Sequence, residues 1–213
     1  MIKLLPNMQF GNNVFVACSG GADSVALACF LGEVFTKKPH TKRRKVTLVY
    51  FNHGTKHAVD AELFVKQLAI KYSWGFLSAN YYGKHTEGEW RAARYDYFKS
   101  LGQHIYTAHH LNDCVENWIM TACHGAPTTI PSRNKRLVSP CHVIRPFLLN
   151  PKSVLIKYLQ KNNQDWIEDP SNAKNEHARN VVRNELLPLI AKINPNIESS
   201  IAKIVSLDCW VYE

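Results

Sequence analysis

The chain has 213 residues, of which 46% are hydrophobic and 20% charged. This balance is typical of a folded globular protein, and it excludes a disordered or low-complexity chain. The formal net charge of +9 favours a polyanionic partner, because fixed cations attract phosphates. No apolar run is long enough to span a membrane and no leader is evident, so we expect a cytoplasmic protein without a membrane partner.

The cysteines are widely spaced and form no CxxC pair. Several lie within apolar segments, so they are interpreted as small buried hydrophobic residues in a reducing compartment. A metal or redox site is the alternative. The six are Cys18, Cys29, Cys114, Cys123, Cys141 and Cys209.

Strands and helices alternate along the first part of the chain. The expected elements are a strand at 14–18, a helix at 23–35, a strand at 46–51, a helix around 61–72, a strand at 76–82, a helix at 88–101, a strand at 104–108 and a helix at 111–122. The alternation predicts an α/β fold with a doubly wound, mostly parallel sheet that is covered on both faces.

The pattern changes after Cys123. The stretch 124–140 is predicted as a long loop, followed by helices at 152–161 and 179–187, the second of which Pro188 ends or kinks. We expect one domain over 1–213, with a core at about 14–145 and a C-terminal helical part at about 146–213.

The stretch Ser19-Gly20-Gly21-Ala22-Asp23-Ser24 joins the first strand to the first helix. Glycines permit a tight turn close to a ligand, and a helix N-terminus attracts an anion, so phosphate is the expected ligand. The stretch matches neither GxxxxGK[ST] nor GxGxxG, and a purely structural turn is the alternative reading.

SGGADS resembles the SGGxDS signature of the PP-loop ATP pyrophosphatases. Further segments occur in the order expected of the tRNA(Ile)-lysidine synthetase family, and the resemblance spans roughly residues 14 to 190. These segments are Asn52-His53-Gly54, EWRAARY at 89–95, TAHHLNDCVEN at 107–117, Arg145-Pro146, DWIEDPSN at 165–172 and RNVVRNELLP at 179–188. Larger members carry C-terminal tRNA-binding domains, so the resemblance implies a short form without them.

The resemblance implies a two-step reaction on the CAU anticodon of an isoleucine tRNA. ATP adenylates the C2 oxygen of the wobble cytidine with loss of pyrophosphate, and the ε-amine of free L-lysine then displaces AMP to give lysidine. The expected cofactors are ATP and Mg²⁺.

The same resemblance implies the site residues. Asp23 is expected to bind the metal and to act in catalysis. Asp113 is expected to contact the lysine amine or to act as its base. Glu116 is expected to act in catalysis by supporting Asp113 or by binding the metal. The expected ATP-binding residues are Ser19, Gly20, Gly21, Ala22, Asp23, Ser24, His53, Arg91 and Arg94, and the expected lysine- or tRNA-binding residues are Asp169, Asn172, Arg179 and Arg183.

Spacing alone leaves simpler readings of these residues open. Asp113 and Glu116 also suit the first turns of an exposed helix, and the paired arginines also suit a solvated surface. Asp169 and Asn172 are also typical of a turn. Many family members have Asp-Asp where this chain has Asn112-Asp113, and the second acid is expected to be the important one.

Two other functions are compatible with the sequence. One is another PP-loop tRNA-modifying enzyme such as a thiolase, against which the separated cysteines argue. The other is a relative that binds tRNA without catalysis, against which the intact SGGADS motif argues. Trp90 and the loops at 37–45 and 124–140 are candidate RNA contacts.

Overall fold

The computed structural model describes residues 1–6, 8, 10–36, 44–54, 57–82, 86–134, 141–168 and 178–211, with only the backbone described at 87 and 208–211. The expected ligand residues Asp169 and Asn172 lie outside these ranges. Most of the basic loop at 37–45 and the end of the loop at 124–140 lie outside them as well.

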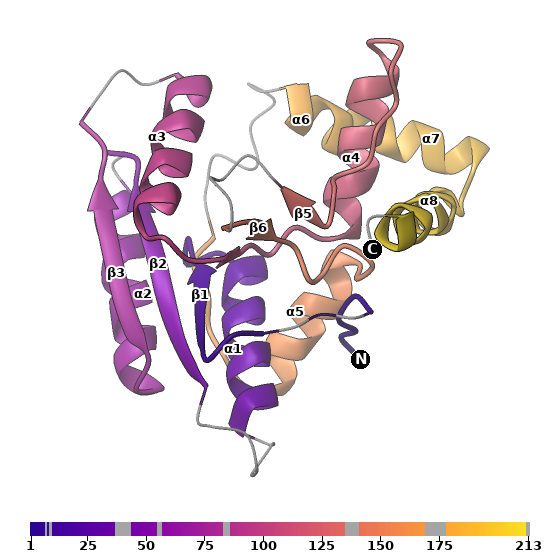
Figure 1. Cartoon of the computed structure of the whole chain (residues 1–213). Helices are drawn as coiled ribbons and strands as arrows, with labels where there is room; N and C mark the ends of the chain where they lie inside the picture. The colour runs from indigo at the N-terminus through magenta and orange to yellow at the C-terminus, as the bar shows by residue number, and fades with distance from the viewer. Residues whose placement is uncertain are drawn as a thin grey trace.

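Within the described ranges, helices and strands alternate as expected (Figure 1). In chain order the elements are β1 (Asn13–Ala17), α1 (Ala22–Thr36), β2 (Lys45–Asn52), α2 (Ala58–Lys71), β3 (Gly75–Asn80), α3 (Glu87–Ser100), β4 (Ile105–Tyr106), α4 (Leu111–Ala122), β5 (Arg133–Asn134), β6 (Val143–Ile144), α5 (Lys152–Lys161), α6 (Ala178–Val181), the π-helical turn η2 (Val182–Leu186), α7 (Leu187–Ile193) and α8 (Ile197–Val211).

The strands form one sheet in the order β3-β2-β1-β4-β6-β5. All pairs are parallel except β5 with β6, which confirms the doubly wound, mostly parallel fold. Val16 of β1 pairs with Leu48 of β2 on one side and with Tyr106 of β4 on the other. The chain therefore reverses its direction of winding between β1 and β4, and ligands of such sheets bind beyond the carboxyl ends of the strands at this point.

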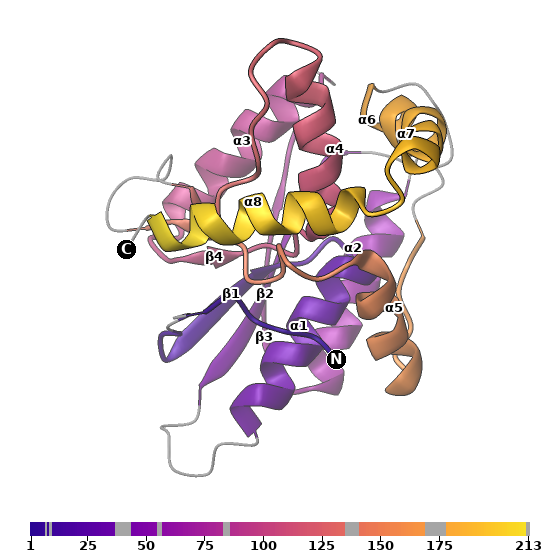
Figure 2. The ribbon, with the colours of Figure 1, turned by 90° about the vertical axis from the view of Figure 1, so that its right-hand side faces the viewer.

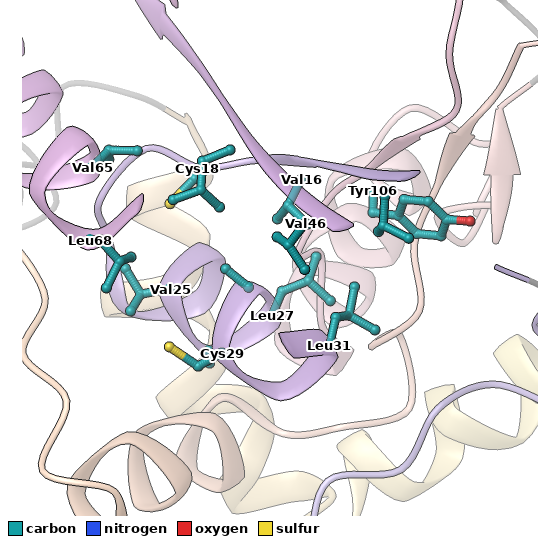
Figure 3. Packing of buried hydrophobic residues seen from close by; sticks show 14 of the residues in the cluster. Val16, Cys18, Val25, Leu27, Cys29, Leu31, Val46, Val65, Leu68 and Tyr106 are labelled. Atoms are coloured by element: carbon teal, nitrogen blue, oxygen red, sulfur yellow. The ribbon is translucent and has the colours of Figure 1, made fainter. Parts of the chain in front are cut away.

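Both faces of the central strands are buried. Val16 and Val46 point toward Leu27 of α1, and Val25 of the same helix lies beside Leu68 of α2, in a core that α5 completes (Figure 3). Alternate residues point the other way, and the opposite core includes Phe98 of α3. Burial on both sides explains why the strands are continuous apolar runs rather than alternating ones.

The C-terminal helices build a third cluster around α4. Val115 and Ile119 of α4 pack with Val182 of η2 and with Ile201 and Val205 of α8. Figure 2 shows α8 lying across α4. In the part of the chain that the structure describes, no helix combines the length and the apolar character needed to cross a membrane.

Several sequence predictions need correction in this part. Pro188 does not end the helical run, which continues to Ile193. The run instead loosens just before the proline, where the N–H of Leu187 bonds to the carbonyl of Val182 in η2. Pro188 lies in the first turn of α7, where the missing N–H is tolerated.

Several short or late elements of the structure were not predicted from the sequence. The stretch 124–140 contains β5, β6 follows it, and α8 was not predicted at all. The fourth strand is limited to Ile105 and Tyr106, shorter than the predicted 104–108. Of the described cysteines, Cys123 is exposed and the others are buried, and all of these are free thiols.

Candidate active site at the carboxyl edge of the sheet

The glycine loop after β1 is closed by its own serines. The backbone N–H of Ser19 donates to the hydroxyl oxygen of Ser24 over 3.2 Å, and that hydroxyl donates to the carbonyl of Gly21 over 2.9 Å. Gly20 has a φ of +85°, a conformation that side chains disfavour, so a glycine is needed there. The loop is preformed, and Ser24 helps to hold its shape.

A distant segment completes this loop. The backbone N–H of Ile167 donates to the carbonyl of Gly20 over 2.9 Å. Ile167 belongs to the segment DWIEDPSN, which therefore reaches the SGGADS loop through its described residues. This contact brings two of the sequence motifs together at the same edge of the sheet.

The carboxylates of Asp23 and Asp113 meet at one histidine. His110 Nε2 lies 3.5 Å from Asp23 Oδ2 and 3.6 Å from Asp113 Oδ2. Asp113 also accepts the backbone N–H of His110 at the start of α4, over 2.9 Å. Lys152 Nζ approaches Asp23 Oδ2 to 3.7 Å from the start of α5. The loops after β1 and β4 thus place both predicted acids in a single site.

Asp23 and His110 shift one another's pKa toward the charged forms. Burial alone would lower the pKa of His110, but the adjacent carboxylates of Asp23 and Asp113 outweigh it and raise that pKa. Burial alone would raise the pKa of Asp23, but His110 and Lys152 outweigh it and lower that pKa. The site therefore favours an imidazolium next to an ionised carboxylate.

Glu116 is the most deeply buried acid of the site, with 1% of its surface exposed. Arg183 reaches it with two donors, Nε at 2.7 Å from Oε1 and an Nη at 3.0 Å from Oε2. Arg179 Nε lies 3.3 Å from Oε2. The predicted arginine pair is therefore held by the predicted glutamate, which orients both guanidinium groups.

A cavity of about 390 Å³ lies beside these groups. Its polar lining residues include His110, Glu116, Lys152 and Arg183. The remaining lining residues come from α4, α7, α8 and the turn between α7 and α8. The volume falls in the range of small-molecule sites, which is about 300–1,000 Å³. Lys152 and the α8 wall were not found from the sequence, because no motif marks them.

A second group surrounds two partly buried histidines, His53 and His109. Burial, followed by the charge of Arg94, lowers the pKa of His53 to about 4. Burial also lowers the pKa of His109 to about 3 against the opposing charge of Asp113, and the charges of nearby arginines lower it further. These are Arg145, Arg179 and Arg94. Both imidazoles are therefore neutral near pH 7, and they lie among guanidinium groups.

The other predicted arginine of this group is in a different environment. Arg91 lies over the ring of Tyr95, with its guanidinium carbon 5.3 Å from the ring centroid. Arg145, quoted only as part of a motif, is 3% exposed and donates to the carbonyl of Pro131 over 2.7 Å. Burial lowers the pKa of Arg145. No pattern in the sequence indicated that this arginine is buried.

The donors present fit a magnesium ion at Asp23 better than at Glu116. Asp23 Oδ1 is buried and has no hydrogen-bond partner among the described residues, whereas both oxygens of Glu116 are bound by arginine. Mg²⁺ typically takes one or two carboxylates and completes its shell with phosphate and water. No group of three or more His, Cys, Asp or Glu side chains suited to a metal occurs in the described ranges, so His53, His109 and His110 do not form such a cluster there.

Comparison with known proteins agrees with this geometry. A family model described as the PP-loop domain matches residues 2–190. The tRNA(Ile)-lysidine synthase of Bacteroides thetaiotaomicron is 32% identical over 89% of this chain and 46% of its own length. That of Enterococcus faecalis is 28% identical over 89% of this chain and 43% of its own length.

A solved structure shares the fold. The U34-tRNA thiolase NcsA from Methanococcus maripaludis, determined with its [4Fe-4S] cluster, aligns with a TM-score of 0.73 and 15% identity over 97% of this chain and 73% of its own. The glycine loop, the sheet topology and the family match together show that this chain belongs to the PP-loop domain family. It is similar to tRNA(Ile)-lysidine synthases along most of its length, and it spans about half the length of these curated relatives.

Proposed function

We propose that this protein is an ATP-dependent tRNA-modifying enzyme that joins lysine to C2 of the wobble cytidine in the CAU anticodon of an isoleucine tRNA. The observation that carries the proposal is the convergence of Asp23 and Asp113 on His110. This convergence supports a site in which the loop at Ser19–Ser24 binds phosphate and the nearby carboxylate of Asp113 accepts a proton. The similarity to tRNA(Ile)-lysidine synthases supports the choice of substrates.

In the first step, the C2 oxygen of the cytidine bonds to the α-phosphorus of ATP, the bond between the α-phosphorus and the bridging oxygen breaks, and pyrophosphate leaves. The loop at Ser19–Ser24 holds the phosphates through its backbone N–H groups. Asp23 is the proposed ligand of Mg²⁺, which when bound neutralises charge on the phosphates. Arg91, Arg94 and His53 are proposed to lie along the rest of the nucleotide.

In the second step, the ε-amine of lysine bonds to C2, the bond between C2 and oxygen breaks, and AMP leaves with that oxygen. The amine must lose a proton, because a free lysine ammonium has a pKa near 10.4. Asp113 is proposed to accept it. Glu116 keeps Arg179 and Arg183 in place, and Arg179, at 40% side-chain exposure, remains accessible to a substrate carboxylate or an RNA phosphate.

The proposal is tested with purified protein, ATP, Mg²⁺, labelled lysine and a CAU isoleucine tRNA transcript, followed by digestion and mass measurement of the nucleosides. Lysidine is the expected product. Asp23→Asn is expected to stop pyrophosphate release, whereas Asp113→Asn is expected to stop lysidine formation while the first step continues. Asp96→Asn, at an exposed position in α3, is the matched control.

Each alternative outcome contradicts a different part of the proposal. Pyrophosphate release without lysidine in the wild type would reject lysine as the nucleophile or this tRNA as the substrate. Neither product, together with tRNA binding, would reject catalysis in favour of a binding protein.

A further inference from the structure

The cavity wall on α8 carries an acid outside the region that the family model matches. That region ends at residue 190, and Glu198 lies in the first turn of α8. Asn112 Nδ2 donates to Glu198 Oε1 over 2.7 Å, and Asn112 Oδ1 accepts the backbone N–H of Lys152 over 2.9 Å. One amide therefore joins the starts of α4, α5 and α8, and it fixes Glu198 at the edge of the cavity.

The charges of the cavity are unevenly compensated. Arg183 neutralises Glu116, and Lys152 lies close to Asp23. None of the ion pairs between described residues includes Glu198, whose bond to Asn112 is to a neutral amide. A carboxylate held in this way beside a partly enclosed space attracts a cationic group of a ligand.

The rest of the cavity suits a short aliphatic chain. Leu187 and Ile197 contribute apolar surface, and Glu116 and His110 lie on the polar side toward Asp113. A ligand with one ammonium group at Glu198 and an aliphatic stem along this surface would direct a second amine toward the acids of the site. Lysine, the amine substrate of the proposed function, is a diamine with this arrangement.

We propose that Glu198 binds the α-ammonium group of the lysine substrate and is a specificity-determining residue of this site. The inference rests on the proposed function, because it assumes that the amine substrate enters this cavity. Asn112 acts as a positioning residue, since it orients Glu198 without needing to contact the substrate.

The test removes the Glu198 carboxylate and the α-amine of the substrate separately. Kinetics of the second step are measured with L-lysine and with 6-aminohexanoic acid, which lacks the α-amine, for the wild type and Glu198→Gln. Glutamine keeps an oxygen that accepts the Asn112 hydrogen bond, so α8 stays docked. Glu185→Gln, at an exposed position outside the cavity lining, is the matched control.

Glu198→Gln is expected to raise the KM for lysine on the order of tenfold, with kcat and the KM for 6-aminohexanoic acid unchanged. In the wild type, loss of the α-amine is expected to raise KM by a similar factor. If the variant weakens both substrates equally, or neither, Glu198 does not bind the α-ammonium group.

Failure of the proposed function is separable from failure of this inference. If the wild type forms no lysidine, the same four combinations are compared by equilibrium calorimetry with L-lysine and 6-aminohexanoic acid, without RNA. If the wild type binds lysine more tightly than 6-aminohexanoic acid and Glu198→Gln does not, the result would support the role of Glu198 without supporting the proposed reaction. If lysine does not bind, or binds the wild type and Glu198→Gln with the same affinity, the proposed role of Glu198 would be rejected.

Discussion

Arg183 and Glu116 form a two-pronged ion pair although they are 67 residues apart in the chain. The carboxylate is buried in α4, and the guanidinium approaches it from the π-helical turn η2. The hydrogen bonds that Arg183 donates to Glu116 raise the pKa of Arg183 against the opposing effect of burial. The pair therefore connects the C-terminal helices to α4.

Removing one partner of this ion pair is expected to lower the stability of the protein. Arg183→Ala should lower the free energy of unfolding by about 2 kcal/mol, less than for a fully buried pair because Arg183 is partly exposed and Arg179 still reaches Glu116. Arg183→Lys should recover part of the loss, since it keeps the charge without the planar two-donor geometry. Urea unfolding measures both, and equal stability of the three proteins would contradict the pairing.

The pH dependence of stability should report on His110. Because its pKa is raised in the folded state, it contributes stability that is complete below the unfolded value of about 6.5 and is lost as pH rises through the folded value. The lowered pKa of Asp23 adds stability that is lost as pH falls through the acid range below about 4.

The test compares unfolding free energies of the wild type and His110→Gln at about pH 6 and pH 9, on either side of the ordinary imidazole range. The wild type should lose more stability over this interval than the variant. His124→Gln, at an exposed position, should keep the wild-type dependence. Parallel curves for the wild type and His110→Gln would contradict the charge relationship.

Adjacent histidines should titrate differently. Burial lowers the pKa of His109 to about 3, while the two nearby carboxylates raise that of His110 above its usual range. In NMR titrations near pH 6, the His110 ring should be protonated and the His109 and His53 rings neutral. If the three rings titrate with the same midpoint pH, these differences in pKa would be contradicted.

Two helical glycines should respond oppositely to alanine. A Cβ at Gly32 of α1 would overlap the ring of Trp74, so Gly32→Ala should destabilise the protein by about 1–3 kcal/mol. A Cβ at Gly88 of α3 would meet nothing within 4 Å, so Gly88→Ala should stabilise by about 0.5–1 kcal/mol through helix propensity. Thermal unfolding of both variants tests this difference in sign.

The proposed metal role of Asp23 makes a separate prediction for binding. Asp23→Asn should reduce the affinity for ATP about tenfold in the presence of Mg²⁺ and by much less in its absence, since one charged ligand contact is worth that order of free energy. Calorimetric titration with ATP, with and without Mg²⁺, measures the difference. If the affinity for ATP falls equally with and without Mg²⁺, Asp23 does not act as a metal ligand. Its role would then be to pair with His110 and Lys152.

Local patterns predicted the parts of the site that depend on neighbouring residues. The glycine turn, the helix after it and the placement of Asp113 and Glu116 on one helix follow from short spacings. In the structure these helices are α1 and α4. These features need only the backbone preferences of glycine and the repeat of a helix.

Long-range contacts account for what was missed. Lys152 and Glu198 come to the site through Asn112, and no local spacing relates the three. The strands β5 and β6 have two residues each, too few for an alternating pattern to be recognised. Glu116 had no visible partner in the sequence, because Arg183 approaches only after the C-terminal helices fold back.

The hydrogen bond from Ile167 to Gly20 bears on how the protein is made. The SGGADS loop leaves the ribosome early, but the backbone group that binds its Gly20 carbonyl is synthesised about 150 residues later, and such distant contacts form slowly. The loop therefore reaches its final set of contacts only after the fifth helix and the segment beyond it have emerged. During translation the SGGADS turn would be synthesised long before the contact that completes it.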